Sequence, residues 1–178
     1  MSKDRNSFPA RTNQKLYFAR LQLDLMQAAL AADDFAAEPR AMACREAAIW
    51  HLDAAIGAFM QELSRFYKVQ PPVSTPEALT AVMAGQGRVS PEAGILAQLL
   101  ADPDSWFSQL RRLLAACHRP VELPDIAVEA DDPARIAIPV RMTDGDLPLS
   151  APDQALLQDI HRQLTQAIRD FRAELVEF

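Results

Sequence analysis

Residues 49–66, IWHLDAAIGAFMQELSRF, carry apolar side chains at alternating steps of three and four residues. The apolar positions of this pattern are Ile49, Leu52, Ile56, Phe59, Leu63 and Phe66. Such steps keep side chains on one face of an α-helix, because the helix turns once in about 3.6 residues. The stretch therefore predicts the seam of a helical bundle, within a long helix over residues 39–68.

Apolar side chains at helical spacing also mark other stretches of the chain. These are residues 11–32, 76–84, 91–101, 103–118 and 152–177. Several of the predicted helices begin at a proline, which the first helical turn tolerates because its N–H would have no partner there. These prolines are Pro39, Pro76, Pro91, Pro103 and Pro152. We predict one all-α domain over residues 1–178, an antiparallel bundle of about five helices.

The stretch over residues 11–32 carries two neighbouring apolar stripes. One stripe holds Leu16, Ala19, Leu23, Met26 and Leu30, and the other holds Phe18, Leu21, Leu25 and Ala28. Two adjacent stripes indicate a wide buried face. We therefore expect this helix to lie at the centre of the bundle.

The apolar period changes within residues 119–150. Alternate positions are apolar there, as is typical of a strand: Ile126 and Val128, then Ile136, Ile138, Val140 and Met142. The sequence predicts a partly extended insertion before the last helix. It forms either a short β-hairpin, in which Pro139 would confine its strand to an edge, or an arm draped over the helices.

The composition narrows the classes of partner. The chain carries 24 acidic and 18 basic residues among 178, a net charge of −6. Proteins that bind phosphate backbones usually have a basic face and a positive balance, so nucleic acid is disfavoured.

The sequence also predicts a cytoplasmic location. Cys44 and Cys117 form no CxxC motif and are expected to be reduced. Residues 1–14 lack the apolar core of a signal peptide, and apolar runs are broken well before the roughly 18 residues of a membrane span.

Arg45 and His51 are the candidate catalytic residues. An arginine six positions before a histidine is typical of the helical ribonucleases called HEPN, in which the arginine binds the scissile phosphate and the histidine assists proton transfer. Six helical residues advance the side chain by roughly 600°, which leaves the two about 120° apart on one helix. Such a site would need two subunits. The alternative is that Arg45 lies at the bundle rim or pairs with a carboxylate, and that His51 is a structural histidine.

Other catalytic and metal-binding patterns are missing from the sequence. None of the three histidines follows a glutamate by three positions, as di-metal bundles require. The strained Gly-x-Ser-x-Gly turn of a serine hydrolase is also lacking. We predict neither a metal site nor a cofactor.

Polar residues near both ends are interpreted as structural. Arg162, Arg169 and Arg172 alternate with Asp159, Asp170 and Glu174 in the last helix, which is typical of a solvated face. Thr12 is interpreted as a helix cap, and the cluster Asn13, Gln14 and Lys15 receives no chemical role.

Four separated segments resemble a known family in the same order. They are Thr12-Asn13-Gln14-Lys15 with Tyr17-Phe18-Ala19; Arg45-Glu46-Ala47-Ala48 with His51-Leu52 and Glu62-Leu63; Pro103-Asp104-Ser105-Trp106 with Gln109-Leu110; and Phe171-Arg172. The family is an uncharacterised gammaproteobacterial one, a domain of unknown function. The resemblance implies a small, cytoplasmic, helical protein and brings no activity or catalytic residue.

We therefore expect a non-enzymatic interaction or regulatory protein. Its partner would be another protein or a second copy of the chain, bound by a groove between helices or by the insertion at residues 119–150. The first alternative is the HEPN-like ribonuclease that uses Arg45 and His51. The second is binding of a small apolar ligand between helices, which predicts a sizeable apolar pocket beside Trp50 or Trp106.

Overall fold

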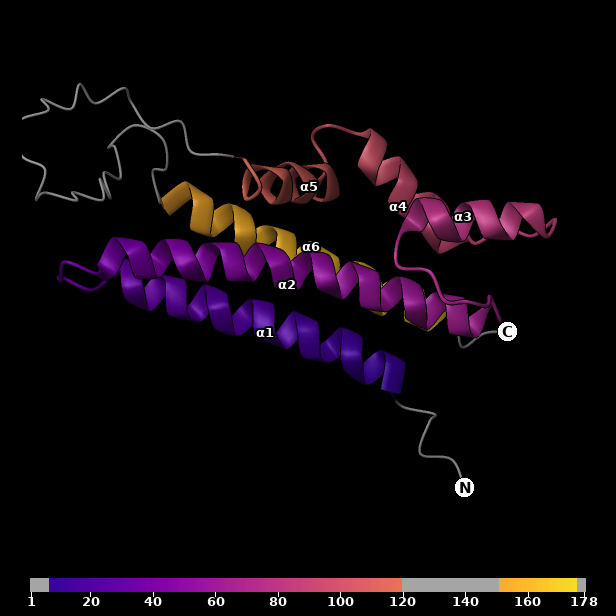
Figure 1. The fold of residues 1–178 in the computed structure, drawn as a ribbon, viewed down its shortest axis with the longest axis horizontal. Coiled ribbons are helices and arrows are strands. Elements are labelled where there is room, and N and C mark those ends of the chain that lie inside the picture. The colour runs from indigo at the N-terminus through magenta and orange to yellow at the C-terminus, as the bar shows by residue number, and fades with distance from the viewer. Residues whose placement is uncertain (1–6, 120–150, 176–178) are drawn as a thin grey trace, which may run out of the picture.

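The computed structural model describes residues 7–119 and 151–175, which form six helices and no strand (Figure 1). The helices are α1 (Ser7–Leu30), α2 (Ala37–Phe66), α3 (Pro76–Gly85), α4 (Pro91–Ala101), α5 (Trp106–Ala116) and α6 (Ala151–Leu175). The all-α prediction is confirmed for these residues. The described residues form six helices, whereas the prediction was about five; each of the six corresponds to one of the stretches with helical spacing, and a turn at Gly87, where φ is +66°, separates α3 and α4. The predicted insertion over residues 119–150, whether hairpin or arm, lies outside the described residues except for Arg119.

Helix α2 packs against four other helices, namely α1, α3, α5 and α6. Helices α1 and α2 form an antiparallel pair, and α6 packs against both, running in the same direction as α2 (Figure 1). Helix α5 packs on α2 and α6, and α3 and α4 continue this side of the molecule. The longest helix therefore takes the centre, since it has partners on several sides.

The predicted seam of α2 is buried over most of its length. Ile49, Leu52, Ile56, Phe59 and Leu63 are buried and meet core residues of α5 and α6, with the Phe59 and Phe171 rings stacked at 5.8 Å. Phe66 is the exception, since it is 44% exposed. A repeat of 3.5 residues drifts by about 20° per heptad on a straight helix, which turns the last member of the series away from the core.

The predicted wide buried face of α1 is wrong. Leu16, Ala19, Leu23 and Met26 are buried, but Leu30 is partly exposed. Of the second stripe, Phe18 is half-buried and Leu21, Leu25 and Ala28 are exposed. Helix α1 packs on α2 and α6 along one side and lies at the edge of the molecule, not at its centre (Figure 1).

Side-chain hydroxyls determine three helix starts. Thr75, Ser90 and Ser105 each accept a hydrogen bond from the backbone N–H three residues on, at 3.2, 3.3 and 3.1 Å. The cap at Ser105 starts α5 at Trp106, whereas the sequence predicted residue 103. Helix α2 starts at Ala37, without a capping side chain, and α1 starts at Ser7, so Thr12 is not a cap.

Candidate functional site

Arg45 faces α6. Its side chain is nearly buried, and one terminal nitrogen lies 3.7 Å from Oδ1 of Asp153. Its Nε is buried without a hydrogen-bond partner within the described residues. The guanidinium therefore joins the N-terminal half of α2 to the start of α6 through a long ion pair.

His51 faces α1. Its ring meets the Phe18 ring edge to face, with centroids 5.4 Å apart. Burial, with a smaller contribution from Lys15, lowers the pKa of His51 below its ordinary value, so the imidazole is neutral near pH 7. Since Arg45 contacts α6 and His51 contacts α1, one chain does not bring the two residues into a common site.

A polar cluster joins α1, α2 and α6 at the other end of α2. The guanidinium of Arg172 donates from Nε and from a terminal nitrogen to the two carboxylate oxygens of Glu62, both at 2.8 Å. A second terminal nitrogen donates to Oδ1 of Asn13 at 2.8 Å, and the Thr12 hydroxyl donates to Glu62 at 3.0 Å. We call Thr12, Asn13, Glu62 and Arg172 the three-helix clamp.

The clamp corrects the interpretation of Arg172 as part of a solvated face. A bidentate arginine–carboxylate pair is among the strongest and most directional polar contacts in proteins. The Glu62 carboxylate is nearly buried and the Arg172 side chain is about three-quarters buried. The clamp fixes the relative positions of three helices, and its members come from segments that carry the family resemblance.

His161 forms a second polar link between α1 and α6. Its Nε2 lies 3.1 Å from the Leu16 carbonyl oxygen, which can only accept, so Nε2 carries the proton. Burial lowers the pKa of His161 below its ordinary value, although the bond to Leu16 opposes this effect. The folded protein therefore favours the neutral imidazole.

This burial predicts a pH dependence of stability. The unfolded chain binds a proton on His161 near its ordinary pKa of 6.5, whereas the folded chain binds it only at lower pH. The free energy of unfolding should thus fall as the pH decreases below about 6.5. We expect the variant His161→Gln to lose this part of the pH dependence in urea unfolding between about pH 7.5 and pH 5. Equal pH slopes in the two proteins would contradict the assignment. His51→Gln is the comparison: burial also lowers the pKa of His51, but its ring is less buried, so this variant should change the pH slope less than His161→Gln.

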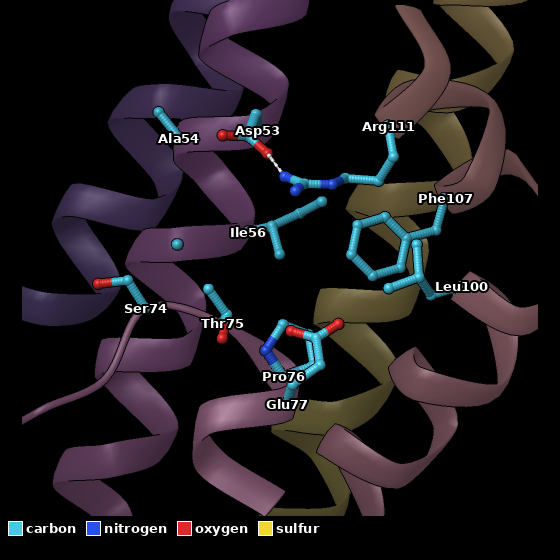
Figure 2. Close-up of a pocket in the computed structure, with 11 residues that line it drawn as sticks. Asp53, Ala54, Ile56, Ser74, Thr75, Pro76, Glu77, Leu100, Phe107 and Arg111 are labelled. Carbon is cyan, nitrogen blue, oxygen red and sulfur yellow. Dashed lines mark hydrogen bonds and ion pairs between the residues drawn. The ribbon is translucent and has the colours of Figure 1, made fainter. Parts of the chain in front are cut away.

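A cavity of about 250 Å³ lies between α2, the start of α3 and α5 (Figure 2). Arg111 pairs with Asp53 at 2.9 Å on one side, and Thr75, Pro76 and Glu77 lie across from them. The cavity has both charged and apolar walls, since Ile56, Leu100 and Phe107 line it together with the Asp53–Arg111 pair. The volume is below the roughly 300–1,000 Å³ typical of ligand sites.

A second cavity, of about 470 Å³, is lined by charged residues of both signs and by the aromatic or apolar residues Phe66, Tyr67, Pro91 and Leu175. Beside it the hydroxyls of Tyr67 and Ser90 both donate to the buried Glu92 carboxylate, at 2.8 Å each. Burial and this carboxylate raise the pKa of Tyr67 to about 12. Tyr67 therefore keeps its proton and donates a hydrogen bond to Glu92. This bond links α4 to the end of α2.

The side of α1 opposite the core carries mainly apolar side chains. Its large side chains Tyr17, Leu21 and Leu25 are 54%, 37% and 54% exposed. The smaller or polar members Ala10, Gln14 and Ala28 are exposed as well. At about 100° per residue these six side chains fall within an arc of about 80°. We call them the outer face of α1.

Charged residues border the outer face. Arg20 and Asp24 lie on one flank as an ion pair, with Nε and Oδ2 3.7 Å apart and both side chains more than half exposed. Single exposed apolar residues are normal on protein surfaces, but a contiguous apolar stripe indicates an interaction site. The prediction of a wide buried face missed this surface, because it assumed that both stripes of α1 enter the core.

The part of the chain that the structure describes contains no helix long and apolar enough to cross a membrane. It also contains no group of three or more His, Cys, Asp or Glu side chains placed to hold a metal ion.

Comparison with known proteins gives one match. A family model described as a family of unknown function (DUF6586) matches residues 7–178. No curated protein and no solved structure matches the chain.

Proposed function

The chain belongs to the DUF6586 family of unknown function, and from its own geometry we propose that it is a non-enzymatic interaction protein that binds an apolar helix of a protein partner through the outer face of α1. The observation that carries this proposal is the exposure of Tyr17, Leu21 and Leu25 on the side of α1 that faces away from the core.

The energetics favour docking at this face. Full burial of a leucine side chain stabilises by about 1.5–3 kcal/mol relative to full exposure, and covering the exposed 37–54% of these three side chains recovers about half of that for each. Helix α1 is already formed and held by the three-helix clamp and by the His161 bond. Binding therefore requires little ordering of the surface, which reduces its entropic cost.

The alternatives have weaker support. A HEPN-like ribonuclease would need Arg45 and His51 from two subunits, since in one chain they contact different helices. An apolar ligand was expected in a pocket beside Trp50 or Trp106, and neither tryptophan lines either of the two cavities described above. We also propose a cytoplasmic location, because the free thiols of Cys44 and Cys117 suit a reducing compartment.

A comparative affinity experiment tests the proposal. The tagged full-length wild type and two variants are each used to capture proteins from a cell extract, with quantification by mass spectrometry. Leu21→Glu places a charge in the outer face, whereas Ile95→Glu places one at an equally exposed apolar site on α4, where Ile95 is 42% exposed. We expect a specific partner to be captured by wild type and Ile95→Glu and reduced at least about tenfold with Leu21→Glu. Equal capture by all three proteins would contradict the proposal.

A further inference from the structure

We propose that the partner of the outer face is the same face of a second copy of this chain, with the two α1 helices antiparallel. The inference rests on the proposed function, because it uses the same surface and names what covers it.

The outer face is complementary to itself about Leu21. Tyr17 and Leu25 lie four residues to either side of Leu21, and Gln14 and Ala28 lie seven residues to either side. A two-fold axis at Leu21 places Tyr17 at the same level along the helix axis as Leu25 of the second copy, and Leu21 opposite Leu21 of the second copy. Each large side chain thus meets a large apolar side chain.

The charges on the flank favour the antiparallel direction. A two-fold axis perpendicular to both helices brings the same flank of each copy together. It places Arg20 within about 3 Å, along the helix axis, of Asp24 of the second copy, and the converse pair forms by symmetry. The pair within one chain is 3.7 Å long and exposed, so both groups are free to bond across the interface. Parallel helices would bring opposite flanks together, and these two pairs would not form.

The size of the contact predicts a reversible dimer. Helix α1 has 24 residues, a length of about 36 Å, and one helix pairing with another is at the low end of interface sizes. We therefore expect a dissociation constant on the order of 10 μM.

Sedimentation velocity of the full chain, from about 1 μM to about 500 μM, tests for the dimer. We expect wild type to pass from monomer to dimer and Leu21→Glu to raise the dissociation constant at least about tenfold, with the Ile95→Glu value unchanged. An unchanged circular dichroism spectrum shows that the variants are folded.

Asp24→Arg should weaken the dimer through repulsion from Arg20 of the second copy. The double variant Arg20→Asp with Asp24→Arg should restore it, because the opposite charges meet again.

Cysteine cross-linking tests the direction of the helices. In a background of Cys44→Ser and Cys117→Ser, a mild oxidant should link Leu21→Cys chains to each other. Tyr17→Cys should link only when mixed with Leu25→Cys, since antiparallel pairing separates two Tyr17 positions by about 12 Å along the axis. Efficient linking of Tyr17→Cys alone would overturn the antiparallel arrangement.

A wild-type monomer at every concentration would overturn the dimer. If Leu21→Glu still abolished capture of a different protein, the proposed interaction function would stand and only the identity of the partner would be wrong. If wild type were a monomer and Leu21→Glu changed no capture, both proposals would fail.

Discussion

Replacing Phe59 by alanine is expected to lower the free energy of unfolding by about 3–5 kcal/mol. The Phe59 side chain is 1% exposed at the middle of the α2 seam, and its ring stacks on the Phe171 ring of α6, with an interplanar angle of 11°. Truncation removes this contact and leaves a cavity between the two helices, which close packing on both sides prevents from collapsing.

Urea unfolding followed by circular dichroism measures this loss. The matched control is Phe66→Ala on the same helix, for which we expect a smaller loss, of about 1 kcal/mol, because Phe66 is 44% exposed. Similar losses for both variants would contradict the assignment of residues 49–63 as the seam and of Phe66 as its solvent-facing end.

The core helices could be predicted because their pattern is local. In α2 and α6 the apolar side chains recur at helical spacing over many turns, and most of them are buried. The exact starts could be predicted less well. Ser105 and Pro103 both favour a helix start, and only the structure shows that the Ser105 hydroxyl accepts the Ser108 N–H.

The outer face of α1 could not be assigned from the pattern alone. Leu21 and Leu25 have the spacing of buried residues, and an apolar stripe has the same form whether it packs in its own core or against a partner. The structure distinguishes these cases, since α2 and α6 cover one side of α1 and leave the other exposed. The proposed function therefore rests on the stripe that the sequence pattern placed in the core.

The three-helix clamp could not be predicted from the sequence either, for a different reason. Thr12 and Glu62 are 50 residues apart, and Glu62 and Arg172 are 110 apart. No local spacing reports such a contact, and Arg172 follows the alternation of charges typical of a solvated helix. The resemblance included all of these residues, but it carried no information on which of them touch.

Replacing Arg172 by alanine is expected to lower the free energy of unfolding by about 2–4 kcal/mol. The loss arises mainly from the Glu62 carboxylate, which would remain nearly buried with the Thr12 hydroxyl as its donor and without a compensating charge. The exposed arginine one turn before it supplies the control: Arg169→Ala should change stability by less than about 0.5 kcal/mol in the same urea unfolding.

A double variant distinguishes two contributions to the free energy of unfolding. One is the cost of burying Glu62 without its arginine partner, and the other is the stabilisation by the ion pair itself. Replacing Glu62 and Arg172 together by leucine removes both charges and fills similar space, so we expect it to destabilise less than Arg172→Ala alone. A loss larger than that of Arg172→Ala would mean that the bidentate pair is itself strongly stabilising. An effect of Arg172→Ala as small as that of Arg169→Ala would instead mean that water solvates Glu62 and that the clamp does not hold α1 in place. In that case the rigid presentation of the outer face would need another cause, such as the hydrogen bond from His161 to Leu16.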